Sequence, residues 1–194
     1  VLPVGVSLEE FKQLYIDITD AIREVDNNHI VYIEGNWYGT DFSGLTPPWD
    51  DNMSYSFHKY WGEYSLGTIQ SYISMSNQYD IPLWMGESGE NSNHWYYEVF
   101  ALLEENNIGW NFWTHKKVEK ISSPFSAVVT PQYQTLINYW SGNGSQPSAI
   151  YAEAALIGFA NSLKLENCDI LPGVIASLTD PEYGEVSKPY SAHS

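Results

Sequence analysis

The sequence is poor in cysteine and in basic residues, and it has no long hydrophobic run. Cys168 is the one cysteine among 194 residues, so no disulfide can form within the chain. Only 8 Lys and Arg accompany 24 Asp and Glu, which gives a formal net charge of −16. Binding to nucleic acid or to an anionic membrane needs a basic surface, so this charge argues against both. The sequence contains no run of eighteen apolar residues, so it predicts no membrane span.

Aromatic residues are abundant, with 8 Trp, 15 Tyr and 7 Phe. Trp and Tyr combine a large apolar face with a polar edge that needs a partner. We therefore expect some of them to line a groove that binds a neutral ligand. For any single Trp, a position in the core is an equally good interpretation.

Helical and strand-like segments alternate along the chain. Ser7 and Glu10 form a capping box ahead of apolar residues at helical spacing. Helices are predicted at 7–25, 66–79, 94–106, 131–139 and 149–163, and strands at 29–35, 53–57, 81–87 and 108–114. This alternation predicts an α/β fold with a parallel sheet and right-handed crossovers. Four strands cannot close an eight-stranded barrel, which takes about 250 residues.

Each of the four predicted strands ends on side chains suited to chemistry: Glu34, then His58 with Tyr60, then Glu87, then Trp113. Parallel α/β folds place their sites at the carboxyl ends of the strands. Each residue also has a structural interpretation. Glu34 suits a buried carboxylate bonded to loop amides, His58 a core histidine, Glu87 a cap of the following turn, and Trp113 a core ring.

The segments around these residues resemble glycoside hydrolase family 5, the cellulase family of clan A. The four motifs are IVYIEGNW at 30–37, SFHKYW at 56–61, PLWMGESG at 82–89 and GWNFWTHKK at 109–117. The resemblance implies the C-terminal half of a TIM (β/α)8 barrel, strands five to eight with their helices, over 1–178. Residues 179–194 are then a polar tail that we expect to be disordered.

The resemblance also implies catalytic roles. Glu87 matches the nucleophile of a retaining endo-β-1,4-glucanase, and His58 and Tyr60 match the pair that supports the nucleophile and the sugar. The chemistry agrees, because a retaining glycosidase uses a carboxylate nucleophile and a carboxylic acid about 5–5.5 Å away.

Four further residues are expected to bind substrate. Trp113 matches the aromatic platform under the sugar at the cleaved bond, while Trp37 and Trp49 would extend the cleft as stacking surfaces. Glu34 would contact substrate, and it is also a candidate for a surrogate acid. Flat aromatic side chains suit the apolar faces of sugar rings.

The family's acid/base, a Glu after an Asn at the end of the fourth strand, has no counterpart ahead of the Ser7 helix. The family's Arg and His on earlier strands are absent too. We therefore expect this chain to be a half-barrel with exposed sheet edges, completed by a second copy in a homodimer or higher homo-oligomer, or by another chain. Because a positioned general acid contributes about 10²–10⁴-fold in rate, we expect weak or no hydrolysis.

Two other functions stay open: a catalytically inactive, self-assembling half-barrel that binds carbohydrate, and an unrelated acidic α/β protein. No motif indicates a metal or another cofactor, since Asp50 and Asp51 lack the spacing of a calcium loop. The expected partner is a β-glucan polysaccharide or oligosaccharide. Such a polymer is too large to enter a cell, so we expect the protein to be extracellular although no signal peptide is recognisable.

Overall fold

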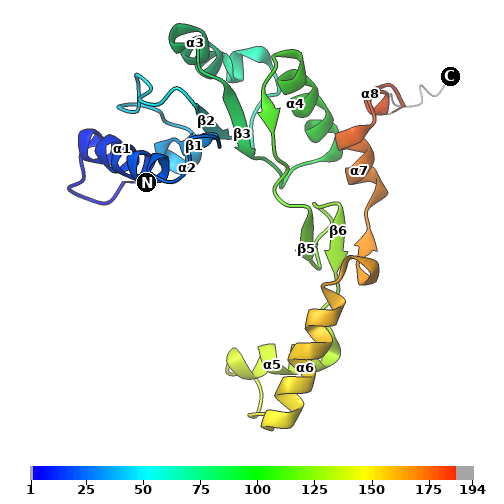
Figure 1. The fold of residues 1–194 in the computed structure, drawn as a ribbon. Coiled ribbons are helices and arrows are strands. Elements are labelled where there is room, and N and C mark those ends of the chain that lie inside the picture. Colours follow the sequence, from blue (N-terminus) through cyan, green and yellow to red (C-terminus); the bar gives the residue numbers. More distant parts are fainter. Residues whose placement is uncertain (1, 187–194) are drawn as a thin grey trace, which may run out of the picture. The chain divides into compact units, whose positions relative to one another are not determined.

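The computed structural model describes residues 2–186, and the chain divides into two compact units, 1–113 and 114–194. The ribbon in Figure 1 shows the elements of each unit along the chain. The half-barrel domain that the sequence predicts over 1–178 stays a prediction.

The first unit alternates helices with the strands of one sheet (Figure 1). Its helices are α1 (Leu8–Arg23), α3 (Gln70–Tyr79) and α4 (Asn93–Glu105), with a four-residue turn, α2 (Asn36–Gly39), and a 3-10 turn, η1 (Leu66–Thr68). Its strands are β1 (Val31–Glu34), β2 (Met53–His58), β3 (Leu83–Glu87) and β4 (Gly109–Trp110).

These four strands form a parallel sheet in the order β1-β2-β3-β4. The predicted α/β fold with a parallel sheet is confirmed. Because the strands are parallel and sequential, their carboxyl ends meet at one edge, and the residues that follow them converge there. Both faces of β2 are covered, since Met53–Phe57 are all buried, as is typical of a parallel sheet.

Apolar side chains from the sheet and from α4 form the core of this unit. Its largest fully buried side chains include Tyr55, Phe57 and Met85 from the strands and Tyr96 and Leu103 from α4. Burying one side chain of this size contributes about 1.5–3 kcal/mol. This packing holds the strand ends in fixed positions.

The predicted capping box is present at α1. The Ser7 hydroxyl accepts from the Glu10 N–H, and the Glu10 carboxylate accepts from the Ser7 N–H. Two predicted elements differ in extent. The helix expected at 66–79 begins as η1 and becomes α-helical at Gln70, and the strand expected at 108–114 is limited to β4, so Trp113 follows it in a loop.

The second unit has a small sheet and a helical hairpin. Strands β5 (Lys116–Val118) and β6 (Phe125–Ala127) are parallel, and β7 (Asp169–Ile170) pairs with β6 in the antiparallel sense. Helices α5 (Pro131–Trp140) and α6 (Ala149–Ser162) pack together, with Tyr133 and Phe159 stacked 3.9 Å apart.

The chain continues through η2 (Leu165–Asn167) and α7 (Pro172–Thr179) to α8 (Tyr183–Val186). The polar tail that we expected to be disordered thus begins with a short helix, and 187–194 lie outside the described residues. No helix among the described residues is long and apolar enough to cross a membrane.

Candidate active site

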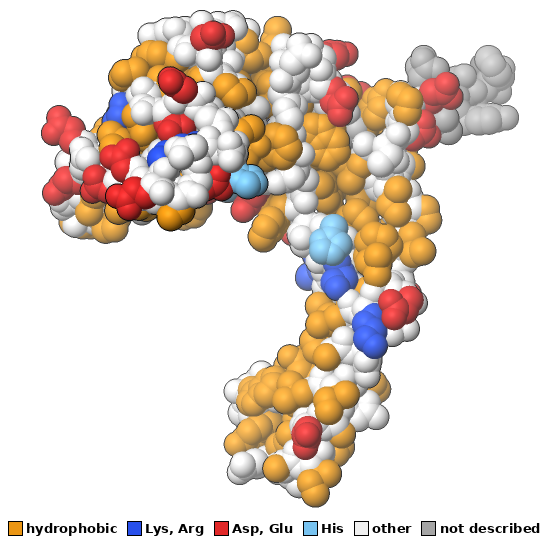
Figure 2. Space-filling view, in the orientation of Figure 1, with side chains coloured by type: hydrophobic (Ala, Val, Ile, Leu, Met, Phe, Trp, Pro, Cys, Tyr) orange, Lys and Arg blue, Asp and Glu red, His pale blue; other side chains and the backbone are white. Residues whose placement is uncertain are grey.

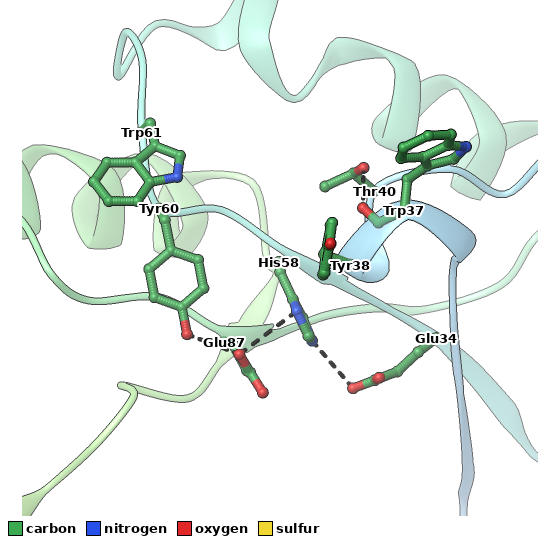
Figure 3. A pocket seen from close by; sticks show the side chains of 8 residues that line it. All are labelled: Glu34, Trp37, Tyr38, Thr40, His58, Tyr60, Trp61 and Glu87. Carbon is green, nitrogen blue, oxygen red and sulfur yellow. Dashed lines mark hydrogen bonds and ion pairs between the residues drawn. The ribbon is translucent and has the colours of Figure 1, made fainter. Parts of the chain in front are cut away.

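A pocket of about 690 Å³ opens at the carboxyl ends of β1, β2 and β3. Figure 3 shows the eight side chains that line it: Glu34, Trp37, Tyr38, Thr40, His58, Tyr60, Trp61 and Glu87. Five of the seven site residues expected from the sequence therefore lie together. Tyr38, Thr40 and Trp61 were not predicted, although Tyr38 and Trp61 directly follow the predicted Trp37 and Tyr60 in the chain.

Glu87 is the carboxylate with the most contacts in this pocket. Its Oε2 accepts a 2.7 Å hydrogen bond from the Tyr60 hydroxyl and lies 3.6 Å from Nδ1 of His58. Figure 3 shows the Tyr60 and His58 side chains converging on Glu87. Both contacts involve the same oxygen. The second oxygen, Oε1, is therefore the one available to react with a ligand.

Glu34 lies on the other side of the His58 ring. Its Oε1 is 3.1 Å from Nε2 of His58, within hydrogen-bond distance. The two glutamates thus flank one imidazole rather than facing each other directly (Figure 3). The His58 side chain is only 11% exposed, against 52% for Glu34 and 30% for Glu87.

A register irregularity between β2 and β3 places His58 beside Glu87. Phe57 pairs with Met85, but the register then shifts and His58 pairs with Glu87 instead of Gly86. A Cβ at Gly86 would lie 2.3 Å from the Ser56 hydroxyl oxygen, so any other residue at this irregularity would force the Ser56 side chain to move. β-bulges of this kind often re-aim side chains next to sites.

The α2 turn forms another wall of the pocket, and its backbone is left-handed. Trp37 and Tyr38 have φ values of 51° and 60°, and Gly39 has 76°. A non-glycine residue in this region costs about 1–2 kcal/mol. Paired backbone hydrogen bonds between Asn36 and Asp41 close the turn and offset that cost. The turn presents Trp37 and Tyr38 with 55% and 76% of their surface exposed.

Gly39 also sets the position of the His58 ring. A Cβ at Gly39 would meet Cγ of His58 at 2.8 Å, so only glycine lets the backbone pass this close. The ring is thus confined by the turn on one side and by carboxylates at both of its nitrogens. A largely buried imidazole with three such neighbours has little freedom to rotate.

The pocket's electrostatics are dominated by carboxylates. Burial, followed by the hydrogen bond to Glu87 and its charge, raises the pKa of Tyr60 far above its usual range. The phenol therefore remains a hydrogen-bond donor to Glu87 at any ordinary pH. Among residues 2–186, no Lys or Arg forms a salt bridge with Glu34 or Glu87.

Two of the expected site residues do not line this pocket. Trp49 precedes β2, at the amino end of the strands, where it stacks on Tyr15 and donates to the Thr19 hydroxyl. The proposal that Trp49 extends the cleft is therefore corrected: its ring packs against α1, because its loop lies at the opposite end of the strands. Trp113 is 52% exposed, and its backbone N–H donates to the Ser88 carbonyl.

Within the described part of the chain, no group of three or more His, Cys, Asp or Glu side chains is arranged to hold a metal ion. The site consists of carboxylates, an imidazole, a phenol and aromatic surfaces. This chemistry suits acid–base or nucleophilic reactions of a neutral ligand with apolar faces.

The parallel α/β sheet thus presents a strand-end carboxylate, Glu87, that accepts a hydrogen bond from a tyrosine and lies beside a histidine. The family model described as Cellulase (glycosyl hydrolase family 5) matches residues 4–118, more than half of the chain. The chain therefore belongs to this family, as its four motifs predicted. No curated protein sequence matches it.

Three solved structures illustrate the shared fold. The cellulose synthase subunit Z from Clostridioides difficile is 12% identical with a TM-score of 0.55, covering 89% of this chain and 56% of its own. An endo-beta-1,4-glucanase from Xanthomonas axonopodis pv. citri is 16% identical with a TM-score of 0.51, covering 78% and 56%. XacCel5A in complex with cellopentaose is 16% identical with a TM-score of 0.51, covering 77% and 56%. The chain spans about half the length of each.

Proposed function

We propose that this chain provides the nucleophile side of a retaining glycoside hydrolase of the endo-β-1,4-glucanase type, with Glu87 as the nucleophile. The main support is the hydrogen bond from Tyr60 to Oε2 of Glu87, which orients the carboxylate while Oε1 stays available. A retaining mechanism needs such an oriented carboxylate to attack the anomeric carbon. Tyr60 then acts as the hydrogen-bonding support of this carboxylate, and His58 lies beside the same oxygen.

The proposed substrate is a β-glucan polysaccharide or oligosaccharide. Exposed aromatic rings border the pocket at Trp37, Tyr38 and Trp61, and such rings bind the apolar faces of sugars. Trp113, exposed beyond β4, remains a proposed platform under the sugar. The complex of XacCel5A with cellopentaose supports a glucan by analogy of fold.

The proposed mechanism needs a general acid in addition to Glu87. Glu34 is the other carboxylate that lines the pocket, but it lies across the imidazole from Glu87 and is half exposed. The catalytic acid of such enzymes lies in a buried position or beside a second negative charge, whereas the Glu34 side chain is 52% exposed. We expect the 194-residue chain on its own to hydrolyse β-glucans weakly or not at all.

A substrate whose leaving group needs no acid tests Glu87 directly. We expect a dinitrophenyl 2-deoxy-2-fluorocellobioside to attach covalently to Glu87, because its leaving group departs without protonation. Mass spectrometry of the digested chain would locate the sugar. Glu87→Gln should show no label, and Glu63→Gln, a glutamate that does not line the pocket, should be labelled normally. A label on another carboxylate would contradict the assignment.

The second candidate is a carbohydrate-binding half-barrel without catalysis that self-assembles. It is favoured by the position of Glu34, the second carboxylate of the pocket, which lies across the His58 ring from Glu87. In that case cellopentaose would change the fluorescence of the exposed tryptophans, while Glu87 would stay unlabelled and no reducing sugar would be released from carboxymethylcellulose. For either function we propose an extracellular location, since the polymer cannot enter a cell.

A further inference from the structure

His58 can donate from only one nitrogen when its ring is neutral, and the two carboxylates beside it are not equivalent partners. The Nε2···Oε1 separation to Glu34 is 3.1 Å, within hydrogen-bond range. The Nδ1···Oε2 separation to Glu87 is 3.6 Å, beyond that range. The single proton of the neutral ring is therefore best placed on Nε2, where Glu34 accepts it.

The ring cannot exchange these partners by turning over. Its side chain is 11% exposed, and Gly39 lies so close that a Cβ there would overlap Cγ of the ring. The choice of tautomer consequently depends on which carboxylate is the better acceptor. Glu34 is the better acceptor, because its oxygen lies within hydrogen-bond distance of the ring and that of Glu87 does not.

We propose that Glu34 is a positioning residue that holds the proton of neutral His58 on Nε2 and so keeps Nδ1 without a proton toward Glu87. This inference rests on the proposed role of Glu87 as nucleophile. Oε2 of Glu87 then has one strong donor, Tyr60, rather than two. A second donor from His58 would stabilise the carboxylate further and weaken it as a nucleophile.

The proposal gives Glu34 a different role from the one expected from the sequence. A residue that only contacts sugar would have no effect on His58 in the free chain. A positioning residue alters the protonated nitrogen of His58 before any ligand is present. The tautomer in the absence of sugar therefore separates the two roles.

Nitrogen NMR of the ¹⁵N-histidine-labelled, 194-residue chain tests this at a pH where the imidazole is neutral. His58→Gln identifies the resonances of His58. We expect the proton on Nε2 in the unaltered chain. In Glu34→Gln, which replaces the acceptor with an amide that can donate to Nε2, the ratio of Nε2–H to Nδ1–H should fall about tenfold or more, because a hydrogen bond to a charged group is lost. Glu34 is half exposed, so this near-isosteric change should leave the fold intact.

Glu98→Gln is the matched control, because it removes a carboxylate 3.7 Å from a different histidine, His94. It should leave the His58 resonances unchanged. An unchanged His58 tautomer in Glu34→Gln would overturn the proposal.

The rate of Glu87 labelling by the fluorinated cellobioside gives a second reading, and we expect it to fall in Glu34→Gln. If the tautomer shifts in Glu34→Gln but neither the unaltered protein nor this variant is labelled, the assignment of Glu87 as nucleophile is refuted. The action of Glu34 on His58 is then still established. If the unaltered protein and Glu34→Gln are both labelled and the tautomer does not shift, the positioning role of Glu34 is refuted. The assignment of Glu87 as nucleophile is then still supported.

Discussion

At the scale of single residues, Tyr60 links the pH dependence of the fold to the site. Its raised pKa means that the folded chain keeps the phenol protonated where an unfolded tyrosine, with a pKa of about 10, loses its proton. The resulting stabilisation is complete below about pH 10 and is lost as the pH rises above that value. The hydrogen bond to Glu87 is thus intact throughout the acidic and neutral range.

Tyr60→Phe should therefore lower the free energy of unfolding by about 1 kcal/mol at neutral pH, since a partly exposed hydrogen bond to a carboxylate is removed. Above pH 10, the free energy of unfolding of Tyr60→Phe should fall less steeply with pH than that of the unaltered chain. Urea denaturation at a series of pH values measures both effects. Tyr64→Phe, outside the pocket, should keep the original alkaline slope, and an equal slope in Tyr60→Phe would argue against the raised pKa.

At the scale of elements, the α2 turn combines a costly backbone with a close approach to His58. Its left-handed residues are held by the Asn36–Asp41 hydrogen bonds and by Tyr72, whose hydroxyl donates to the Thr40 carbonyl. Strained backbone of this kind persists only where its surroundings determine it. The turn therefore behaves as a rigid part of the pocket wall.

Comparing Gly39→Ala with Gly142→Ala separates the cost of a left-handed backbone from the cost of the close contact with His58. Both glycines have nearly the same φ, 76° and 75°, but a Cβ at Gly142 has no heavy atom within 4 Å. Each change should cost about 1 kcal/mol from the backbone alone. Gly39→Ala should cost more and shift the His58 resonances, as measured by urea denaturation and NMR. Equal losses with unchanged His58 signals would contradict the close approach.

At the scale of the whole molecule, the exposed surface bears on self-association. The four-stranded sheet has edges at β1 and β4, and an open edge is a site for pairing with another chain. Figure 2 shows that hydrophobic side chains dominate the visible face of α5 and α6. Large exposed residues there include Trp140, Ile150 and Ile157. Contiguous exposed apolar surface is a common feature of interaction sites.

We therefore expect the chain to form a homodimer or higher homo-oligomer, as sedimentation over a range of concentrations would show. Because each copy has a net charge of −16, added salt should strengthen the association by screening repulsion. A single monomeric species at every concentration and salt level would contradict this prediction. Mass spectrometry of the purified sample would reveal a second type of chain if one supplied the missing partner.

The sequence by itself determined the order and type of the main elements and the residues that follow each strand. These depend on local patterns, such as the Ser7–Glu10 capping box and the apolar runs of β2 and β3, which have the same meaning in any surroundings. It also determined the family, because four motifs occur in order along 30–117. Glu34, His58, Tyr60 and Glu87 could be expected together because parallel strands bring their carboxyl ends to one edge.

Only the tertiary structure decided how those residues meet. The register shift that pairs His58 with Glu87 and the left-handed turn at Trp37 depend on contacts between distant segments, which leave no periodic signal in the chain. The sequence placed Trp49 in the cleft wrongly for the same reason. Its packing partners, Tyr15 and Thr19, lie thirty or more residues earlier in the chain. Residue type determined what each side chain could do, whereas packing between elements determined which partner it reached.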